Sequence, residues 1–198
     1  MKSKREDDYQ DIDTSRTETF SDGVLAIIIT IMVLELEIPD KPTFESLKHS
    51  LPMFFAYILS FIFIGIYWNN HHHMFRALKR VSAGVMWSNL LLLFWLSLIP
   101  FVTSWVGNFH EKKLPAAIYG FVCIMAALSY TVLVYFAKRC NKDTKIAELL
   151  GRDLKGKISL SLYVLGTLFS FFHPYFGYFC YVIVTLAWFI PDKRVISA

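Results

Sequence analysis

The chain has few of the residues and motifs on which catalytic sites are built, and only 18% of its 198 residues are charged. It contains no GxSxG, Walker, Rossmann or CxxC pattern, and no pair of carboxylates lies within an apolar segment. The three cysteines, Cys123, Cys140 and Cys180, share no metal-type spacing and imply no disulfide framework. We therefore predict that the protein is not an enzyme and needs no cofactor.

Metal ligands are also scarce outside one histidine cluster. His71, His72 and His73 follow Asn69-Asn70 at the end of an apolar segment. Consecutive helical residues point about 100° apart, so three adjacent imidazoles do not converge on one ion without ligands from elsewhere. We expect no metal site here. The alternative, a membrane-embedded metalloenzyme, requires bound metal in stoichiometric amount.

Apolar residues, by contrast, are abundant: 55% of the chain is hydrophobic and 17% is aromatic, in long blocks. This pattern is typical of a polytopic helical membrane protein, so we predict an all-α fold with six transmembrane helices. Pro39 is expected to end the first helix, Pro52 to start the second, and Pro100 to interrupt the third. The predicted helices are Thr19 to Ile38, Leu51 to Trp68, Gly84 to Val106, Pro115 to Ala137, Ile158 to Phe172 and Tyr175 to Ile190.

The distribution of positive charge predicts the orientation. Sixteen of the 20 Lys and Arg residues fall on the side that carries both termini, and the cytoplasmic side normally holds this excess. We predict a multi-pass cell-membrane protein in the lipid bilayer, with cytoplasmic N- and C-termini. Residues 1–15 form a polar tail and residues 16–198 one transmembrane domain. The segment from Thr144 to Lys157 is expected to lie as an amphipathic helix on the cytoplasmic membrane surface.

The segment from Arg16 to Leu34 is the most informative of the chain. A polar headpiece with Arg16, Ser21 and Asp22 leads into an apolar run that is short for a bilayer, which needs about 20 residues. Ionisable residues at this depth usually have partners, and those available are Trp68, Asn69, Asn70 and the histidine cluster. Asn89 stands alone in the third apolar segment, where such a residue usually joins helices by hydrogen bonds.

One stripe of the first helix has two interpretations. Gly23, Ile27, Thr30, Ile31, Leu34 and Ile38 share a face at helical spacing. This face either packs against neighbouring helices or lines a pore shared between subunits. In a symmetric oligomer, one Ile or Leu per chain makes a hydrophobic ring that gates ions by dewetting. Glu35 and Glu37 follow at the predicted outer mouth, where they would concentrate cations.

The headpiece Arg16-x-x-x-Phe20-Ser21-Asp22-Gly23, followed by Ala26-Ile27 and Thr30, resembles the signature of the transmembrane protein 175 family, in particular its single-repeat bacterial members. Trp68-x-x-His71-His72-x-x-Phe75 and the stretch from Asn89 to Pro100-Phe101 are similar to the second and third helices of that family's repeat.

The resemblance implies a homotetrameric channel domain, assembled around the first helices, that passes potassium ions with moderate selectivity over sodium. No TVGYG-type filter is present. Ile27 would form the narrowest ring, Ile31 and Leu34 further pore-facing layers, and Thr30 the hydroxyl layer associated with ion preference. The implied structural network consists of Arg16, Ser21, Asp22, Trp68, His71, His72 and Asn89. Which of His71, His72 and His73 meets the headpiece stays open.

A second class of function is a proton-coupled secondary transporter or a proton-permeable channel, in which Asp22 and the histidines relay protons. A transporter predicts saturable flux and discontinuous helices, whereas the chain shows no detectable inverted repeat. No nucleic-acid partner is expected in either case.

Overall fold

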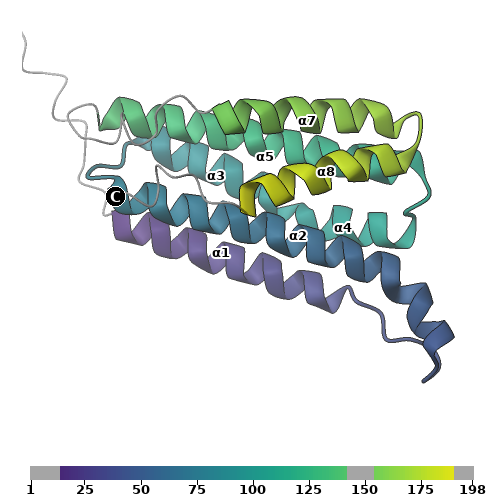
Figure 1. Ribbon diagram of the computed structural model, residues 1–198. Coiled ribbons are helices and arrows are strands. Elements are labelled where there is room, and N and C mark those ends of the chain that lie inside the picture. Colours follow the sequence, from purple (N-terminus) through teal and green to yellow (C-terminus); the bar gives the residue numbers. More distant parts are fainter. Residues whose placement is uncertain (1–13, 142–153, 190–198) are drawn as a thin grey trace, which may run out of the picture.

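A computed structural model describes residues 14–141 and 154–189. These residues form seven α-helices that run back and forth in a bundle (Figure 1). The helix α1, Thr14–Leu34, lies along one edge of the bundle beside α2, and α7 lies along the opposite edge (Figure 1). We call the end with the α1–α2 connection the outer end, after the predicted orientation.

The first helix begins earlier and ends earlier than predicted. It starts at Thr14 and stops at Leu34, so Ile38 lies outside it. The residue before a proline avoids the α conformation, and Ile38 directly precedes Pro39. The apolar stripe of α1 therefore ends with Leu34.

The second helix, α2, runs over Phe44–Ala77 and is 34 residues long. The prediction that Pro52 starts this helix is wrong. Its N-cap is Thr43, whose hydroxyl accepts a hydrogen bond from the Ser46 backbone N–H at 3.3 Å, and Pro52 lies inside. A proline in this position removes one backbone bond, and the rest of the long helix continues past it. The helix also continues past Trp68, so the histidine cluster is helical.

The predicted third segment is divided in two. Helix α3, Ala83–Ser97, is followed after Leu98 by α4, Ile99–Asn108, with Pro100 in its first turn. Pro100 has no N–H to continue the ladder, which accounts for the break.

The remaining helices are α5, Lys113–Cys140; α7, Leu154–Ser170; and α8, Pro174–Phe189. A short turn at Phe171 to His173 joins α7 and α8 in an antiparallel hairpin. Most of the predicted surface helix, residues 144–153, lies outside the described residues, as do residues 1–13, most of the predicted polar tail. The last residues of the predicted surface helix, 154–157, belong to α7.

Four segments of the described chain are long and apolar enough to cross a membrane by length and composition: α1, α2, α3 with α4, and α5. Helix α8 is apolar but shorter. The all-helical prediction is therefore confirmed, whereas the number of six transmembrane helices stays a prediction. The core between the helices is apolar and includes Ile64, Val85, Leu92, Ile99 and Leu133, all at most 1% exposed.

A candidate pore-lining helix and its polar anchor

The polar part of α1 is attached to α3 through a buried serine. Ser21 is fully buried, and its hydroxyl donates to the Thr17 carbonyl at 2.8 Å. The same oxygen accepts a hydrogen bond from the Asn89 side-chain amide at 2.9 Å. A buried hydroxyl that both donates and accepts is fully paired, so this contact fixes α1 against α3 at low energetic cost.

Asn89 extends the contact to α2. Its amide oxygen lies 2.8 Å from His71 Nε2. Because the amide nitrogen already donates to Ser21, the oxygen must accept, and the Nε2 atom of His71 therefore carries the proton. The ring of His71 stacks on Phe75 with centroids 4.2 Å apart, and its Nδ1 atom is buried without a hydrogen-bond partner. One asparagine thus joins three helices.

A second set of contacts connects α1 and α2 beside the buried set. The Trp68 indole N–H donates to Asp22 at 3.0 Å, and His72 Nδ1 lies 2.8 Å from the carboxylate of Glu18. Trp68 and His72 stack with centroids 5.8 Å apart. Glu18 and Asp22 are four residues apart on α1, and Trp68 and His72 are four apart on α2. The two contacts therefore lie one helical turn from each other. Together with the buried contacts they form what we call the anchor: Glu18, Ser21, Asp22, Trp68, His71, His72 and Asn89.

The anchor differs from the predicted network in two residues. Glu18 belongs to it although it was not predicted, and its spacing of four from Asp22 was the available signal. Arg16 is exposed and forms no hydrogen bond or ion pair with another described residue. Arg16 lies two residues before Glu18, and residues two apart on a helix do not share a face, so Arg16 points to a different side of α1. His73 is also exposed and contacts only the ring of His72 among the rings of the described chain.

The opposite face of α1 is not covered by any other described part of the subunit. Ile27 is 58% exposed, Ile31 42% and Leu34 80%, whereas Leu25, Ile28 and Met32 on the other face are at most 3% exposed. Thr30 is exposed in the same stripe, and its hydroxyl donates to the Ile27 carbonyl at 2.9 Å, which leaves the oxygen lone pairs available. The predicted stripe is therefore left largely exposed by the other helices that the structure describes.

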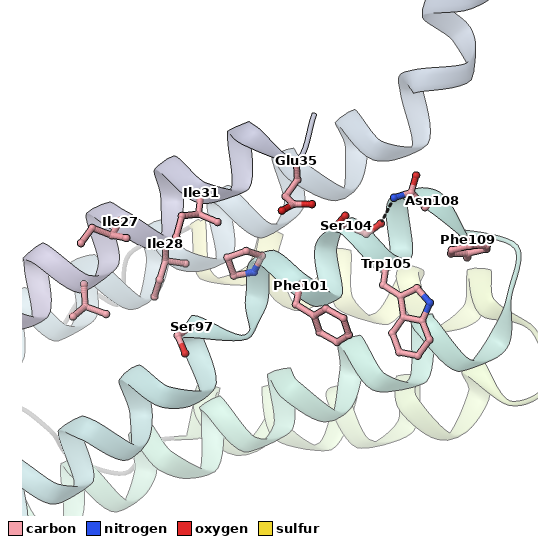
Figure 2. Close-up of a pocket in the computed structure, with 12 residues that line it drawn as sticks. Ile27, Ile28, Ile31, Glu35, Ser97, Phe101, Ser104, Trp105, Asn108 and Phe109 are labelled. Atoms are coloured by element: carbon pink, nitrogen blue, oxygen red, sulfur yellow. Dashed lines mark hydrogen bonds between the residues drawn. The ribbon is translucent and has the colours of Figure 1, made fainter. Parts of the chain in front are cut away.

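A groove runs beside this stripe between α1 and α4, with a volume of about 910 Å³. Figure 2 shows Ile27 and Ile31 on one wall and Phe101 and Trp105 on the other, with Glu35 projecting toward the level of Ser104 and Asn108. Phe101 and Trp105 were not predicted as lining residues, although they share one helical face. The lining of the groove is mostly apolar, with Glu35, Ser104 and Asn108 toward the outer end and Ser97 deeper.

The two predicted outer acids lie in different places. Glu35 lines the groove between α1 and α4, whereas Glu37 lines a separate pocket of about 320 Å³ with Asp40, His49 and His110. Within the described residues, no group of three or more His, Cys, Asp or Glu side chains is placed to hold a metal ion.

Comparisons with known proteins identify the family of the chain. Residues 16–100 match the family model described as the endosomal/lysosomal potassium channel TMEM175. A protein of Chryseobacterium sp. (strain P1-3) named as a potassium channel is 51% identical over 181 residues, which are 91% of this chain and 94% of that protein. Human TMEM175, named as an endosomal/lysosomal proton channel, is 31% identical over 116 residues, 52% of this chain and 23% of the human protein.

The fold is also that of a solved structure. The crystal structure of a lysosomal potassium-selective channel TMEM175 homolog from Chamaesiphon minutus superposes with a TM-score of 0.79 at 24% identity, covering 91% of this chain and 98% of that one. The resemblance identified from the headpiece is therefore confirmed: the chain belongs to the TMEM175 family, which is a family of ion channels and not of enzymes.

Proposed function

We propose that the protein is a potassium-permeable channel whose pore is lined by α1 from each of four identical subunits in the cell membrane. The observation that carries this proposal is the uncovered stripe of α1. Ile27, Ile31 and Leu34 are exposed, although the other face of the helix is buried and held in place by the anchor. A single helical face does not enclose a pore, so the pore requires several copies of α1 around an axis.

The apolar stripe supports a gate that works by dewetting. Rings of Ile27, Ile31 and Leu34 around the axis make a narrow passage from which water withdraws when the radius is small. Ile27 forms the narrowest ring in the proposal. Conduction then depends on small rotations of α1 that change the radius at this level.

The hydroxyl of Thr30 supplies the polar layer between the Ile27 and Ile31 rings. Its hydrogen bond to the Ile27 carbonyl fixes the hydroxyl proton inward along the helix, so the oxygen faces outward as an acceptor. Four such oxygens replace part of an ion's hydration shell. A hydroxyl ring is a weaker discriminator than a carbonyl filter, which fits moderate selectivity for potassium over sodium.

Glu35 supports cation entry at the outer mouth. Its carboxylate lines the groove beside the pore-facing stripe, one turn beyond Ile31. A negative charge in a low-dielectric cleft raises the local concentration of cations. Relatives support the choice of ion, because the Chryseobacterium protein is named as a potassium channel.

The test measures ion flux in liposomes that contain the purified protein. A potassium gradient is set across the membrane, inward or outward, and a potential-sensitive dye reports the membrane potential. We expect a potential of the sign that potassium selectivity sets, and a smaller one for a matched sodium gradient. Protein-free vesicles are the control. Potassium flux equal to that of the control vesicles would exclude the proposal.

A proton-permeable channel is the second candidate, favoured by the name of the human relative. The Glu18–His72 and Asp22–Trp68 contacts place two carboxylates at the inner end of α1, where protons would enter. A pH-sensitive dye inside vesicles with a proton gradient and no potassium distinguishes the two candidates. Saturable flux without single-channel steps would instead indicate a transporter.

A further inference from the structure

A second groove lies between α2 and α8, away from the pore-facing stripe. It has a volume of about 550 Å³ and extends from Lys48 and Tyr175 at the outer end to Ile62 and Leu186. Its walls include Phe55 and Val182, which are 66% and 39% exposed. Neither the candidate pore nor the anchor uses any of these residues.

The polar groups of this groove are gathered at its outer end. Lys48, His110 and Tyr175 lie there, at the level where α2 and α8 begin. The hydroxyl of Tyr178 donates to the His110 carbonyl at 3.0 Å, which ties α8 to the α4–α5 connection. Deeper in the groove, the Thr185 hydroxyl is paired with the Tyr181 carbonyl at 2.9 Å. The inner part therefore presents apolar surface without a free donor.

The dimensions match one leaflet of a bilayer. From Leu51 to Ile62 the helix rises about 16 Å at 1.5 Å per residue, close to half of a hydrocarbon core roughly 30 Å thick. Lys48 lies almost one turn further out, at the level of lipid headgroups, and Tyr175 is an aromatic residue of the kind found there.

The volume decides which occupant fits. An α-helix about 10 Å wide and 20 Å long occupies on the order of 1,600 Å³, roughly three times the groove. A helix of a second copy would therefore lie over the groove without filling it, whereas a single flexible hydrocarbon chain fits inside. The ammonium of Lys48 is complementary to a phosphate.

Pro52 adds an acceptor beside that ammonium. It lies in the groove wall, and because it has no N–H the carbonyl of Lys48 lacks its usual helical donor. A headgroup that carries both a phosphate and an amine finds a partner for each at this point.

We propose that the groove between α2 and α8 binds a phospholipid, with one acyl chain between Phe55 and Val182 and the headgroup phosphate on Lys48 and Tyr175. The lipid completes the surface of the subunit between α2 and α8, and it couples α8 to the helix that holds the anchor.

The test uses the full-length protein, delipidated in detergent and titrated with dioleoyl phosphatidylethanolamine, with bound lipid counted by native mass spectrometry. Wild-type protein is expected to retain one lipid per chain at low lipid concentration. Val182→Trp fills the groove and should lower lipid affinity about tenfold or more. Val132→Trp is the matched control, since Val132 on α5 is also 39% exposed but lies outside the groove, and it should bind lipid as wild type does.

The headgroup contact is tested separately, in a variant with an intact groove. Lys48→Gln should weaken binding several-fold by removing a charge-assisted contact, whereas Lys113→Gln at the start of α5 should not. In wild-type protein, a phospholipid with a photoreactive acyl chain should label α2 and α8 peptides. Equal lipid binding by the Val182 and Val132 variants, or labelling spread over all helices, would overturn the proposal. Loss of assembly with unchanged lipid binding in Val182→Trp would overturn it in favour of a second copy.

Discussion

At the scale of single residues, one face of α1 holds the helix against its neighbours, and residues on another face are exposed. Ser21 and Asp22 face inward to partners on α2 and α3, whereas Ile27 and Thr30 are exposed on the face that the other described helices leave open. Substitutions on the two faces are therefore expected to have different consequences. Inward ones should affect stability, and outward ones should affect conduction.

Asn89→Ala should destabilise the folded channel. It leaves the Nε2–H of His71 without its acceptor and removes the donor to Ser21, at a cost of about 1–3 kcal/mol for each buried group left unpaired. We expect a lower unfolding temperature in a detergent thermal-shift assay. Asn108→Ala is the control, because within the described residues the exposed Asn108 amide bonds only to the Ser104 carbonyl of its own helix. If both variants unfold at the wild-type temperature, Asn89 does not hold the helices together.

Ile27→Asn should increase conductance. A polar side chain at the narrowest proposed ring lowers the cost of keeping water there, so the constriction stays wet. The measurement is single-channel current in planar bilayers. Ile158→Asn on α7, where the isoleucine is 53% exposed, serves as the control and should leave the current unchanged. An unaltered current in Ile27→Asn would remove Ile27 from the gate.

Thr30→Ala should lower the preference for potassium over sodium. The substitution removes the oxygen ring together with the methyl group, and Thr30→Ser keeps the oxygen while it lacks the same methyl group, so the two variants differ only in the hydroxyl. Under bi-ionic conditions the reversal potential should move toward zero for the alanine variant and stay near the wild-type value for serine. A reversal potential that is the same in all three proteins would assign selectivity elsewhere.

At the scale of helices, the sequence predicted where apolar segments lie better than where they end. The start of α2 was missed because polar residues dominate Phe44 to Ser50, and the N-cap Thr43 was a weaker signal than Pro52. Helix ends depend on caps and on packing that composition does not contain.

The contacts of the anchor could be predicted only in part. Trp68 and His72 share a helical face, as do Asp22 and Glu18, so their pairing follows once α1 and α2 are known to be antiparallel neighbours. The placement of Asn89 between Ser21 and His71 depends on the position of α3, which no local pattern specifies. The exposure of Ile27 and Leu34 likewise depends on which helices leave one side of α1 open.

Helices α5, α7 and α8 pack through small residues, and Gly120 and Gly177 are the two tightest points. A Cβ atom at Gly120 would meet the hydroxyls of Tyr181 and Thr167, and the Tyr181 hydroxyl also donates to the Ala116 carbonyl at 3.1 Å. Gly120→Ala should therefore destabilise the protein by about 1–3 kcal/mol through overpacking.

The matched control for Gly120→Ala is Gly65→Ala in α2, where a Cβ would have no neighbour within 4 Å. Alanine favours a helix over glycine by up to about 1 kcal/mol, so this variant should be neutral or more stable. Unfolding temperatures of both variants measured side by side give the comparison. Equal unfolding temperatures would contradict the prediction, because they would show that the side chains around Gly120 move aside for a methyl group at little cost.

At the scale of the whole molecule, the proposed pore requires further subunits around the uncovered stripe of α1. Leu34 is 80% exposed at the outer end of the stripe, and in the proposed tetramer other copies of α1 surround it. In a cysteine-free background, Leu34→Cys should form disulfide-linked dimers on mild oxidation, because copies of this position lie close to one axis. Leu168→Cys on α7, where the leucine is 56% exposed at the opposite edge, should not.

Native mass spectrometry of the wild-type protein should give four times the 23.0 kDa chain mass. A monomer mass together with unlinked Leu34→Cys would contradict a pore built from α1, because one stripe has no other wall to close against.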